Sequence, residues 1–122
     1  MSQQKLSPQV LDIDLDAEVD KITLRLRDIL RQNLNRRGLV VAMSGGIDSS
    51  VCAALAVKAL SSKKVYGLLL PEKDSSSNSL KRGKLLAEHL GIEYLIHDIA
   101  PTLEAIGCYQ WRDDAIKRIF PD

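Results

Sequence analysis

A short polar segment near the middle of the chain carries the residues best suited to chemistry. Residues 44–50 read SGGIDSS and follow directly on the apolar run at residues 39–43. Two successive glycines let a backbone turn sharply, so that its N–H groups can approach an anion without obstruction by a Cβ atom. If a helix begins after the glycines, its N-terminus adds roughly half a positive charge at the same place. The segment therefore predicts a phosphate-binding loop.

The side chains of this loop fit a triphosphate that is bound together with Mg²⁺. Its serines supply hydroxyl donors, and Asp48, which would repel a bare phosphate, suits a metal ion that bridges phosphate oxygens. The loop has neither GxxxxGK[ST] nor GxGxxG spacing, so it differs from the two commoner phosphate loops. A purely structural interpretation stays open, in which Gly-Gly makes a tight turn and Ser or Asp caps a helix.

The elements around the loop predict an α/β fold in which strands and helices alternate. Continuous apolar runs at residues 39–43, 65–70 and 92–96 predict three strands, the first of them a central strand of a parallel sheet. Helices are expected between these strands, and two short helices after residue 101. Right-handed crossovers leave chiefly the strand orders 3-2-1 and 2-1-3. A 4-3-4-3 spacing predicts one apolar face of an initial helix, formed by Leu15, Val19, Ile22, Leu26 and Ile29.

Size and charge narrow the class of protein. A chain of 122 residues with 45% hydrophobic residues provides one small domain, expected at residues 14–122 after a flexible tail at residues 1–13. The net charge of +1 argues against binding to nucleic acid or to an anionic membrane surface. The chain has neither a long apolar run nor a signal peptide, so we expect a cytoplasmic domain that does not enter a membrane.

The sequence SGGIDSS resembles the SGGxDS fingerprint of the PP-loop ATP pyrophosphatase superfamily. Members of that superfamily cleave ATP between the α and β phosphates and transfer AMP to a substrate oxygen. Within it, the chain is most similar to NAD synthetases over most of residues 15–122. Besides the loop, the likeness rests on LLPE at residues 69–72, SSSNS at 75–79, LAEHLGI at 86–92, DIAPTLEA at 98–105, GCY at 107–109 and RDDAI at 112–116.

This resemblance implies a three-layer α/β sandwich with a parallel sheet, of the adenine nucleotide alpha hydrolase type, incomplete here with about three strands. It implies that Asp48 is a Mg²⁺ ligand, that Leu70 lies against the adenine, and that the loop at residues 75–79 borders the nucleotide. No residue of this chain is assigned a catalytic role. The implied ATP-binding residues are Ala42, Met43, Ser44, Gly45, Gly46, Ile47, Asp48, Ser49, Ser50 and Leu70.

The activity implied by the resemblance is the ATP-dependent amidation of deamido-NAD to NAD. The nicotinate carboxylate would attack ATP to form an acyl adenylate, and ammonia would then displace AMP. The chain contains no glutaminase domain, which favours free ammonia or a partner that supplies it. Two alternatives stay open. One is a PP-loop enzyme that adenylates another carboxylate or a tRNA base, and the other is a non-catalytic nucleotide-binding module.

The resemblance also predicts that part of the enzyme is missing. NAD synthetase chains continue beyond the region matched here, and a second magnesium ligand and most of the deamido-NAD pocket belong to that later part. In the order 3-2-1, the strand at residues 39–43 would have an unpaired apolar edge, which is an aggregation hazard unless it is covered. We therefore expect a truncated gene product of a longer enzyme, or a homodimer or complementing chain that completes the site.

Overall fold

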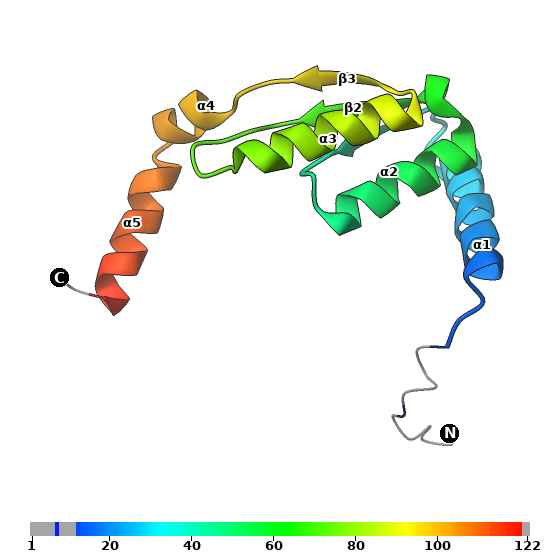
Figure 1. The fold of residues 1–122 in the computed structure, drawn as a ribbon, viewed down its shortest axis with the longest axis horizontal. Coiled ribbons are helices and arrows are strands. Elements are labelled where there is room, and N and C mark those ends of the chain that lie inside the picture. The colour runs from blue at the N-terminus through cyan, green and yellow to red at the C-terminus, as the bar shows by residue number, and fades with distance from the viewer. Residues whose placement is uncertain (1–6, 8–11, 121–122) are drawn as a thin grey trace.

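The structure is a computed structural model that describes residue 7 and residues 12–120, so the predicted tail lies largely outside the described residues. Strands and helices alternate along the chain, as predicted (Figure 1). The elements are α1 (Leu15–Asp28), the π-helical turn η2 (Ile29–Asn33), β1 (Leu39–Ala42), α2 (Ile47–Leu60), the 3₁₀ turn η3 (Ser62–Lys64), β2 (Val65–Leu69), α3 (Ser77–Leu90), β3 (Glu93–Ile96), α4 (Ala100–Ala105) and α5 (Cys108–Ile119).

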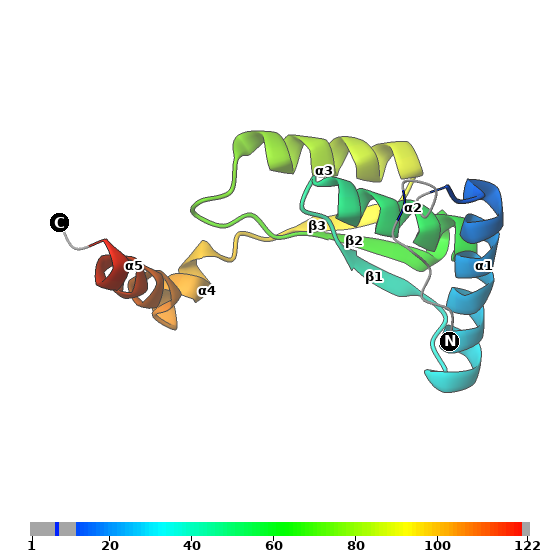
Figure 2. The same ribbon diagram turned by 90° about the horizontal axis from the view of Figure 1, so that it is seen from below.

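The three strands form one parallel sheet in the order β1-β2-β3, which confirms the first of the two predicted orders. Leu39 pairs with Val65, and Tyr66 pairs with Glu93. Helices α2 and α3 lie on one face of this sheet (Figure 2). Among the described residues, no helix covers the opposite face. The α/β class with a parallel sheet is thus present, with one of the two outer helical layers in place.

The prediction of a central strand at residues 39–43 is wrong for the described part of the chain. Strand β1 lies at the edge of the sheet, and its residues alternate between half-buried and exposed. Val40 is 62% exposed because it points away from the helical layer. The sequence is apolar on both faces of this strand, but the described residues provide packing partners for only one of them.

The core between the sheet and its helices fixes where the predicted loop begins. Met43, the last residue before the loop, is buried, and its sulfur would lie 2.9 Å from a Cβ atom placed on Gly67 of the neighbouring strand. Leu69 is 1% exposed, and burying such a side chain contributes roughly 2 kcal/mol. The core cluster consists of Met43, Ala53, Ala56, Val65, Leu69, Ala87 and Ile92.

The buried face of α1 agrees with the predicted one only in part: Val19, Leu26 and the following Ile29 are half-buried. Leu15 and Ile22 are 69% and 39% exposed, whereas Thr23 and Leu30 are each 3% exposed. The Thr23 hydroxyl is satisfied by donating to the backbone carbonyl of Asp20 at 3.0 Å, so this polar side chain can be buried without an unpaired group. The apolar spacing therefore predicted the contact face in part and missed Thr23, which can pack there because its hydroxyl bonds within the helix.

Helix α1 is tied to the C-terminal end of α2 by Arg27. Its Nε donates to the carbonyl of Ala59 at 2.5 Å, and a terminal nitrogen donates to the carbonyl of Lys58 at 3.2 Å. The last carbonyls of a helix have no partner within the helix and carry partial negative charge. The guanidinium therefore provides donors for the free carbonyls at the C-terminal end of α2 and offsets their partial negative charge. The predicted phosphate loop precedes the N-terminal end of the same helix.

Helices α4 and α5 extend beyond the end of the sheet, away from α1 (Figure 1). Trp111 and Phe120 are 66% and 74% exposed, so most of α5 does not contribute to the core. Tyr109 in its first turn is the exception, being only 7% exposed. In the part of the chain that the structure describes, no helix has the length and apolar character needed to cross a membrane.

Candidate nucleotide-binding site

The predicted phosphate loop connects the C-terminal end of β1 with the N-terminus of α2. Gly45 has φ of +77°, a left-handed backbone that disfavours residues with a Cβ atom. A Cβ atom at this position would also collide with the backbone carbonyl oxygen of Ser79, at the start of α3. There are thus two reasons for a glycine here. It allows the positive φ angle, and it leaves room for the close approach of Ser79.

Serine hydroxyls hold the loop in shape. The hydroxyl oxygens of Ser44 and Ser49 lie 3.1 Å apart, and the N–H of Gly46 donates to the Ser44 hydroxyl at 3.3 Å. The hydroxyls of Ser49 and Ser50 donate to the Gly46 carbonyl at 3.1 and 2.7 Å. The loop is therefore organised by its own side chains before any ligand binds, which reduces the ordering cost of binding.

The N-terminus of α2 has no side-chain cap among the described residues. Helix α1 is capped by Asp14, whose carboxylate accepts from the N–H of Ala17 at 3.1 Å, and α3 is capped by Ser76. In α2 the N-cap is Gly46, which has no side chain to accept from the N–H groups of the first turn. The interpretation of the loop as a capped turn is thereby disfavoured. The N–H groups of the first turn remain available to an anion.

A cavity of about 220 Å³ lies beside the loop, between the C-terminal ends of β1 and β2 and the start of α3. Ligands of open α/β sheets bind at this end of the strands. Two larger cavities of about 730 Å³ each are lined by residues at the opposite ends of the strands, such as Arg37 and Lys64. The cavity beside the loop is lined by Met43, Ser44, Leu69, Leu70, Pro71, Ser75, Ser79 and Leu80.

Three of the ten predicted ATP-binding residues line this cavity. Met43, Ser44 and Leu70 line the cavity, and so do Ser75 and Ser79 of the loop predicted to border the nucleotide. The other seven predicted residues are not among those that line it. Of these, Ala42, Gly46, Ile47 and Asp48 are exposed, while Gly45, Ser49 and Ser50 are half-buried.

Three lining residues were not predicted as ligands, namely Leu69, Pro71 and Leu80. Leu69 and Pro71 flank the predicted Leu70 in sequence, so their place at the end of a predicted strand could have identified them as lining residues. Leu80 follows the serine loop in sequence, but its position depends on how α3 packs over β2. That packing cannot be deduced from local spacing.

The Asp48 carboxylate is the side chain of the loop that could hold a metal ion. It lies in the first turn of α2, is exposed, and makes no hydrogen bond or ion pair with the described residues. Within residues 12–120 there is no group of three or more His, Cys, Asp or Glu side chains that could hold a metal ion. Mg²⁺ is commonly held by one or two carboxylates plus substrate phosphates, and this donor set fits that mode.

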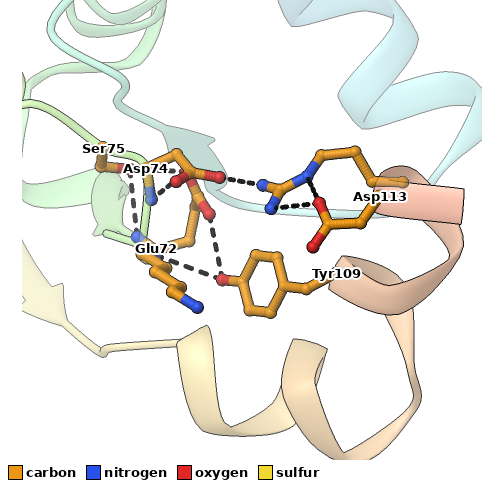
Figure 3. Close-up of polar contacts among 7 residues, drawn as sticks. Glu72, Asp74, Ser75, Tyr109 and Asp113 are labelled. Atoms are coloured by element: carbon orange, nitrogen blue, oxygen red, sulfur yellow. Dashed lines mark hydrogen bonds and ion pairs between the residues drawn. The ribbon is translucent and has the colours of Figure 1, made fainter. Parts of the chain in front are cut away.

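The far wall of the cavity is supported by a polar cluster from α5 (Figure 3). The Tyr109 hydroxyl donates to the Glu72 carboxylate at 3.0 Å and accepts from the N–H of Lys73 at 3.2 Å. Burial, together with the hydrogen bond to Glu72 and the charge of Asp74, raises the pKa of Tyr109, and the Lys73 N–H offsets part of this effect. The sequence analysis noted the segment around Tyr109 only as part of a family likeness and gave it no role.

Comparison with known proteins identifies the family of this chain. The family model described as NAD synthase matches residues 18–118. This chain belongs to the NAD synthase family. The NH(3)-dependent NAD(+) synthetase of Rhizobium meliloti (strain 1021) is 52% identical to it over 116 residues, which are 95% of this chain and 34% of the relative. The predicted family membership is confirmed.

Solved structures of the family share the fold. The NH3-dependent NAD synthetase from Campylobacter jejuni, in complex with the nitrate ion, superposes with a TM-score of 0.71 and 30% identity, covering 77% of this chain and 40% of that one. The NMN synthetase from Francisella tularensis gives a TM-score of 0.73 and 31% identity, covering 83% and 41%. The chain thus spans about a third of the length of the curated relative above.

Proposed function

We propose that this chain supplies the ATP-binding part of an NAD synthetase and that residues 44–50 hold the phosphates of Mg-ATP. The observation that carries the proposal is the uncapped N-terminus of α2 behind the Gly45-Gly46 turn, at the C-terminal end of a parallel strand. Backbone N–H groups and the helix dipole together favour an anion at this point. Leu70, at the end of β2, would contact the adenine across the cavity.

The reaction proposed for the complete enzyme has two steps. The carboxylate of deamido-NAD attacks the α-phosphorus of ATP, forming an acyl adenylate and releasing pyrophosphate. Ammonia then attacks the acyl carbon, AMP leaves, and NAD is formed. Bound Mg²⁺ supplies charge neutralisation at the phosphate oxygens, with Asp48 as its protein ligand.

Residues of this chain contribute to these steps by binding and positioning. The N–H groups at the start of α2 would hold the pyrophosphate as its negative charge grows, since fixed donors lose nothing to reorganisation at that moment. The hydrogen bonds among Ser44, Ser49 and Gly46 keep those donors oriented. Holding the α-phosphorus in one place also removes part of the entropic cost of bringing two substrates together.

The second substrate is proposed from the names of the relatives. A chain named NH(3)-dependent NAD(+) synthetase is 52% identical, so deamido-NAD and ammonia are the first choice. A structure named NMN synthetase has a similar TM-score to one named NAD synthetase. The shared region therefore does not separate the two, and the deamido form of NMN is the alternative substrate to test.

Completion of the site by a further chain segment is part of the proposal. Strand β1 feeds the phosphate loop but lies at the sheet edge, with one strand beside it. An exposed apolar edge strand pairs readily with another strand. We propose a homodimer or a complementing chain on this side. A cytoplasmic location is proposed as well, because the two cysteines, Cys52 and Cys108, are both free.

The experiment incubates the purified chain with Mg-ATP, ammonia and either deamido-NAD or the deamido form of NMN, and then resolves the nucleotide products. Formation of AMP and pyrophosphate only with deamido-NAD is the expected result if the chain acts alone or as a homodimer. Binding of Mg-ATP without turnover would assign the chain a binding role that needs a complementing chain. Absence of Mg-ATP binding would contradict the proposal.

A further inference from the structure

We infer that Tyr109 is a positioning residue for the adenosine half of the nucleotide, acting through Glu72 on the wall of the cavity. The inference rests on the proposed function, because it assumes that ATP occupies the cavity beside the phosphate loop. It assigns a role to α5, the helix that extends beyond the sheet and contributes little to the core (Figure 1).

Glu72 is the centre of the loop between β2 and α3. Its N–H donates to the Ser75 hydroxyl at 3.0 Å, and its carbonyl accepts from the N–H of Ser75, also at 3.0 Å. Its carboxylate accepts from the N–H of Asp74 at 3.1 Å. Ser75 and Pro71 line the cavity on either side of this turn. The position of Glu72 therefore sets the position of the wall.

Tyr109 holds Glu72 from outside the loop (Figure 3). Its hydroxyl donates to the second carboxylate oxygen of Glu72 at 3.0 Å and accepts from the N–H of Lys73 at 3.2 Å. The tyrosine is 7% exposed, so water competes poorly for these bonds. A hydrogen bond to a charged acceptor is stronger than one between neutral groups, and leaving the acceptor short of a donor is costly.

Cationic groups fix the tyrosine ring in turn. The Lys73 ammonium and the Arg112 guanidinium lie 5.4 and 5.2 Å from the centre of the ring, within the range of cation–π attraction. Arg112 also forms an ion pair with Asp74 of the loop and another with Asp113 at 2.8 Å. The first turn of α5 and the loop are thus joined by several contacts between residues more than thirty positions apart.

The geometry separates the two halves of the nucleotide. The phosphates are assigned to Gly45, Gly46 and the start of α2, which have no contact with Tyr109. The wall that Tyr109 holds is assigned to the adenosine. Loss of the Tyr109 hydroxyl is therefore expected to weaken binding of Mg-ATP while leaving binding of Mg-pyrophosphate unchanged. A general folding defect would weaken both.

The experiment measures dissociation constants of Mg-ATP and Mg-pyrophosphate for the full chain and for Tyr109→Phe. The variant keeps the ring that packs under Lys73 and Arg112 and removes only the hydroxyl. We expect about tenfold weaker binding of Mg-ATP and no change for Mg-pyrophosphate. Tyr94→Phe is the matched control, because Tyr94 also donates to a glutamate, Glu88 at 3.4 Å, away from the cavity. It is expected to change neither constant.

A double-mutant cycle tests whether Tyr109 acts through Glu72. Glu72→Ala alone is expected to weaken Mg-ATP binding at least as much as Tyr109→Phe, and the second change should add nothing in its presence. If Tyr109→Phe binds Mg-ATP as tightly as the wild-type chain does, or loses both ligands equally, the inference is wrong and the proposed function stands. If the wild-type chain binds neither ligand, the proposed function itself fails.

Discussion

The two sides of the candidate nucleotide cavity are built in different ways. The phosphate loop is local, since residues 43–50 supply its turn, its hydrogen bonds and its helix N-terminus. The opposite wall, at residues 70–75, depends on Tyr109 and Arg112, which lie more than thirty residues further along the chain. The hydrogen bonds that shape the phosphate loop all lie within residues 43–50. The opposite wall has hydrogen bonds of its own between Glu72 and Ser75, to which Tyr109 and Arg112 add contacts from α5.

This difference suggests a division of labour. In the proposed binding mode, the locally determined loop would supply a rigid set of donors for phosphates, where geometry governs the stabilisation of charge. A wall that is held by a distant helix can respond to whatever else contacts that helix. Most of α5 is exposed, including Trp111 and Ile119, so its docking is sensitive to changes outside the cavity.

The largest expected effect on Mg-ATP affinity comes from Gly45→Ala, which disrupts the phosphate loop. The left-handed backbone at Gly45 disfavours a Cβ atom, and that atom would also collide with the Ser79 carbonyl, so the loop must move. We expect Mg-ATP binding to weaken by about 100-fold, equivalent to about 2.7 kcal/mol, as measured by calorimetry.

Gly91→Ala is the control for this substitution. Gly91 also has a positive φ, +64°, but a Cβ atom there meets nothing within 4 Å. It should destabilise the fold slightly and leave Mg-ATP affinity unchanged. If the two variants lose affinity equally, the close approach of the two sides has no part in binding.

The next largest effect is expected for Asp48→Asn, which changes the metal dependence of binding. The variant should bind Mg-ATP about tenfold more weakly, because it lacks the carboxylate ligand. It should bind metal-free ATP at least as tightly as the wild-type chain does, since a negative charge beside the phosphates is removed. Both constants can be measured with and without chelator.

Asp16→Asn controls for the helix dipole in this comparison. Asp16 also lies in the first turn of a helix, α1, but far from the loop in sequence. It should leave both constants unchanged. An Asp48→Asn chain that binds Mg-ATP normally would show that the loop does not hold a metal through this residue.

A smaller effect, on stability, is expected at the C-terminal end of α2, where Arg27→Met removes the donors to the carbonyls of Ala59 and Lys58. The free energy of unfolding should fall by about 1 kcal/mol in urea titrations, with Mg-ATP affinity unchanged. Arg25→Met is the matched control, because Arg25 lies in the same last turn of α1. Loss of affinity in Arg27→Met would mean that the local loop depends on distant support after all.

The smallest expected effect concerns how the stability contributed by Tyr109 depends on pH. The pKa of Tyr109 is raised by burial and by Glu72, so the folded state favours its neutral form. Its contribution to stability is complete below the ordinary tyrosine pKa of about 10 and is lost as the pH rises through the higher folded value. The stability of the wild-type chain should therefore fall more steeply above about pH 10 than that of Tyr109→Phe in urea titrations. Parallel curves would contradict this assignment.

The local part of the fold and site could be predicted from the sequence. Strand lengths, the Gly-Gly turn and the helix after it follow from patterns within a few residues, and Asp14 acts as an N-cap near the predicted helix start. What failed depends on packing partners. The spacing of apolar residues could not show that Thr23 is buried while Ile22 is 39% exposed, nor that β1 lies at a sheet edge with Val40 exposed.

The contact between Tyr109 and Glu72 could not be predicted for the same reason. The segments that contain them, residues 69–72 and 107–109, are separate parts of the family likeness, and 37 positions separate the two residues. Only the packing of α5 against the loop after β2 brings them together. Local patterns therefore predicted the turn and the helix start on the loop side of the cavity, and tertiary structure was needed to find its opposite wall.

The most direct test of the central claim is a titration of the isotope-labelled chain with Mg-ATP, followed through its backbone amide resonances. The account predicts the largest shifts at Gly45, Gly46 and the first turn of α2, with smaller shifts at Leu70 and Ser75. Amides near Arg37 and Lys64, at the opposite ends of the strands, should not move. Shifts confined to those residues, or no shifts at all, would contradict the assignment of the phosphate loop.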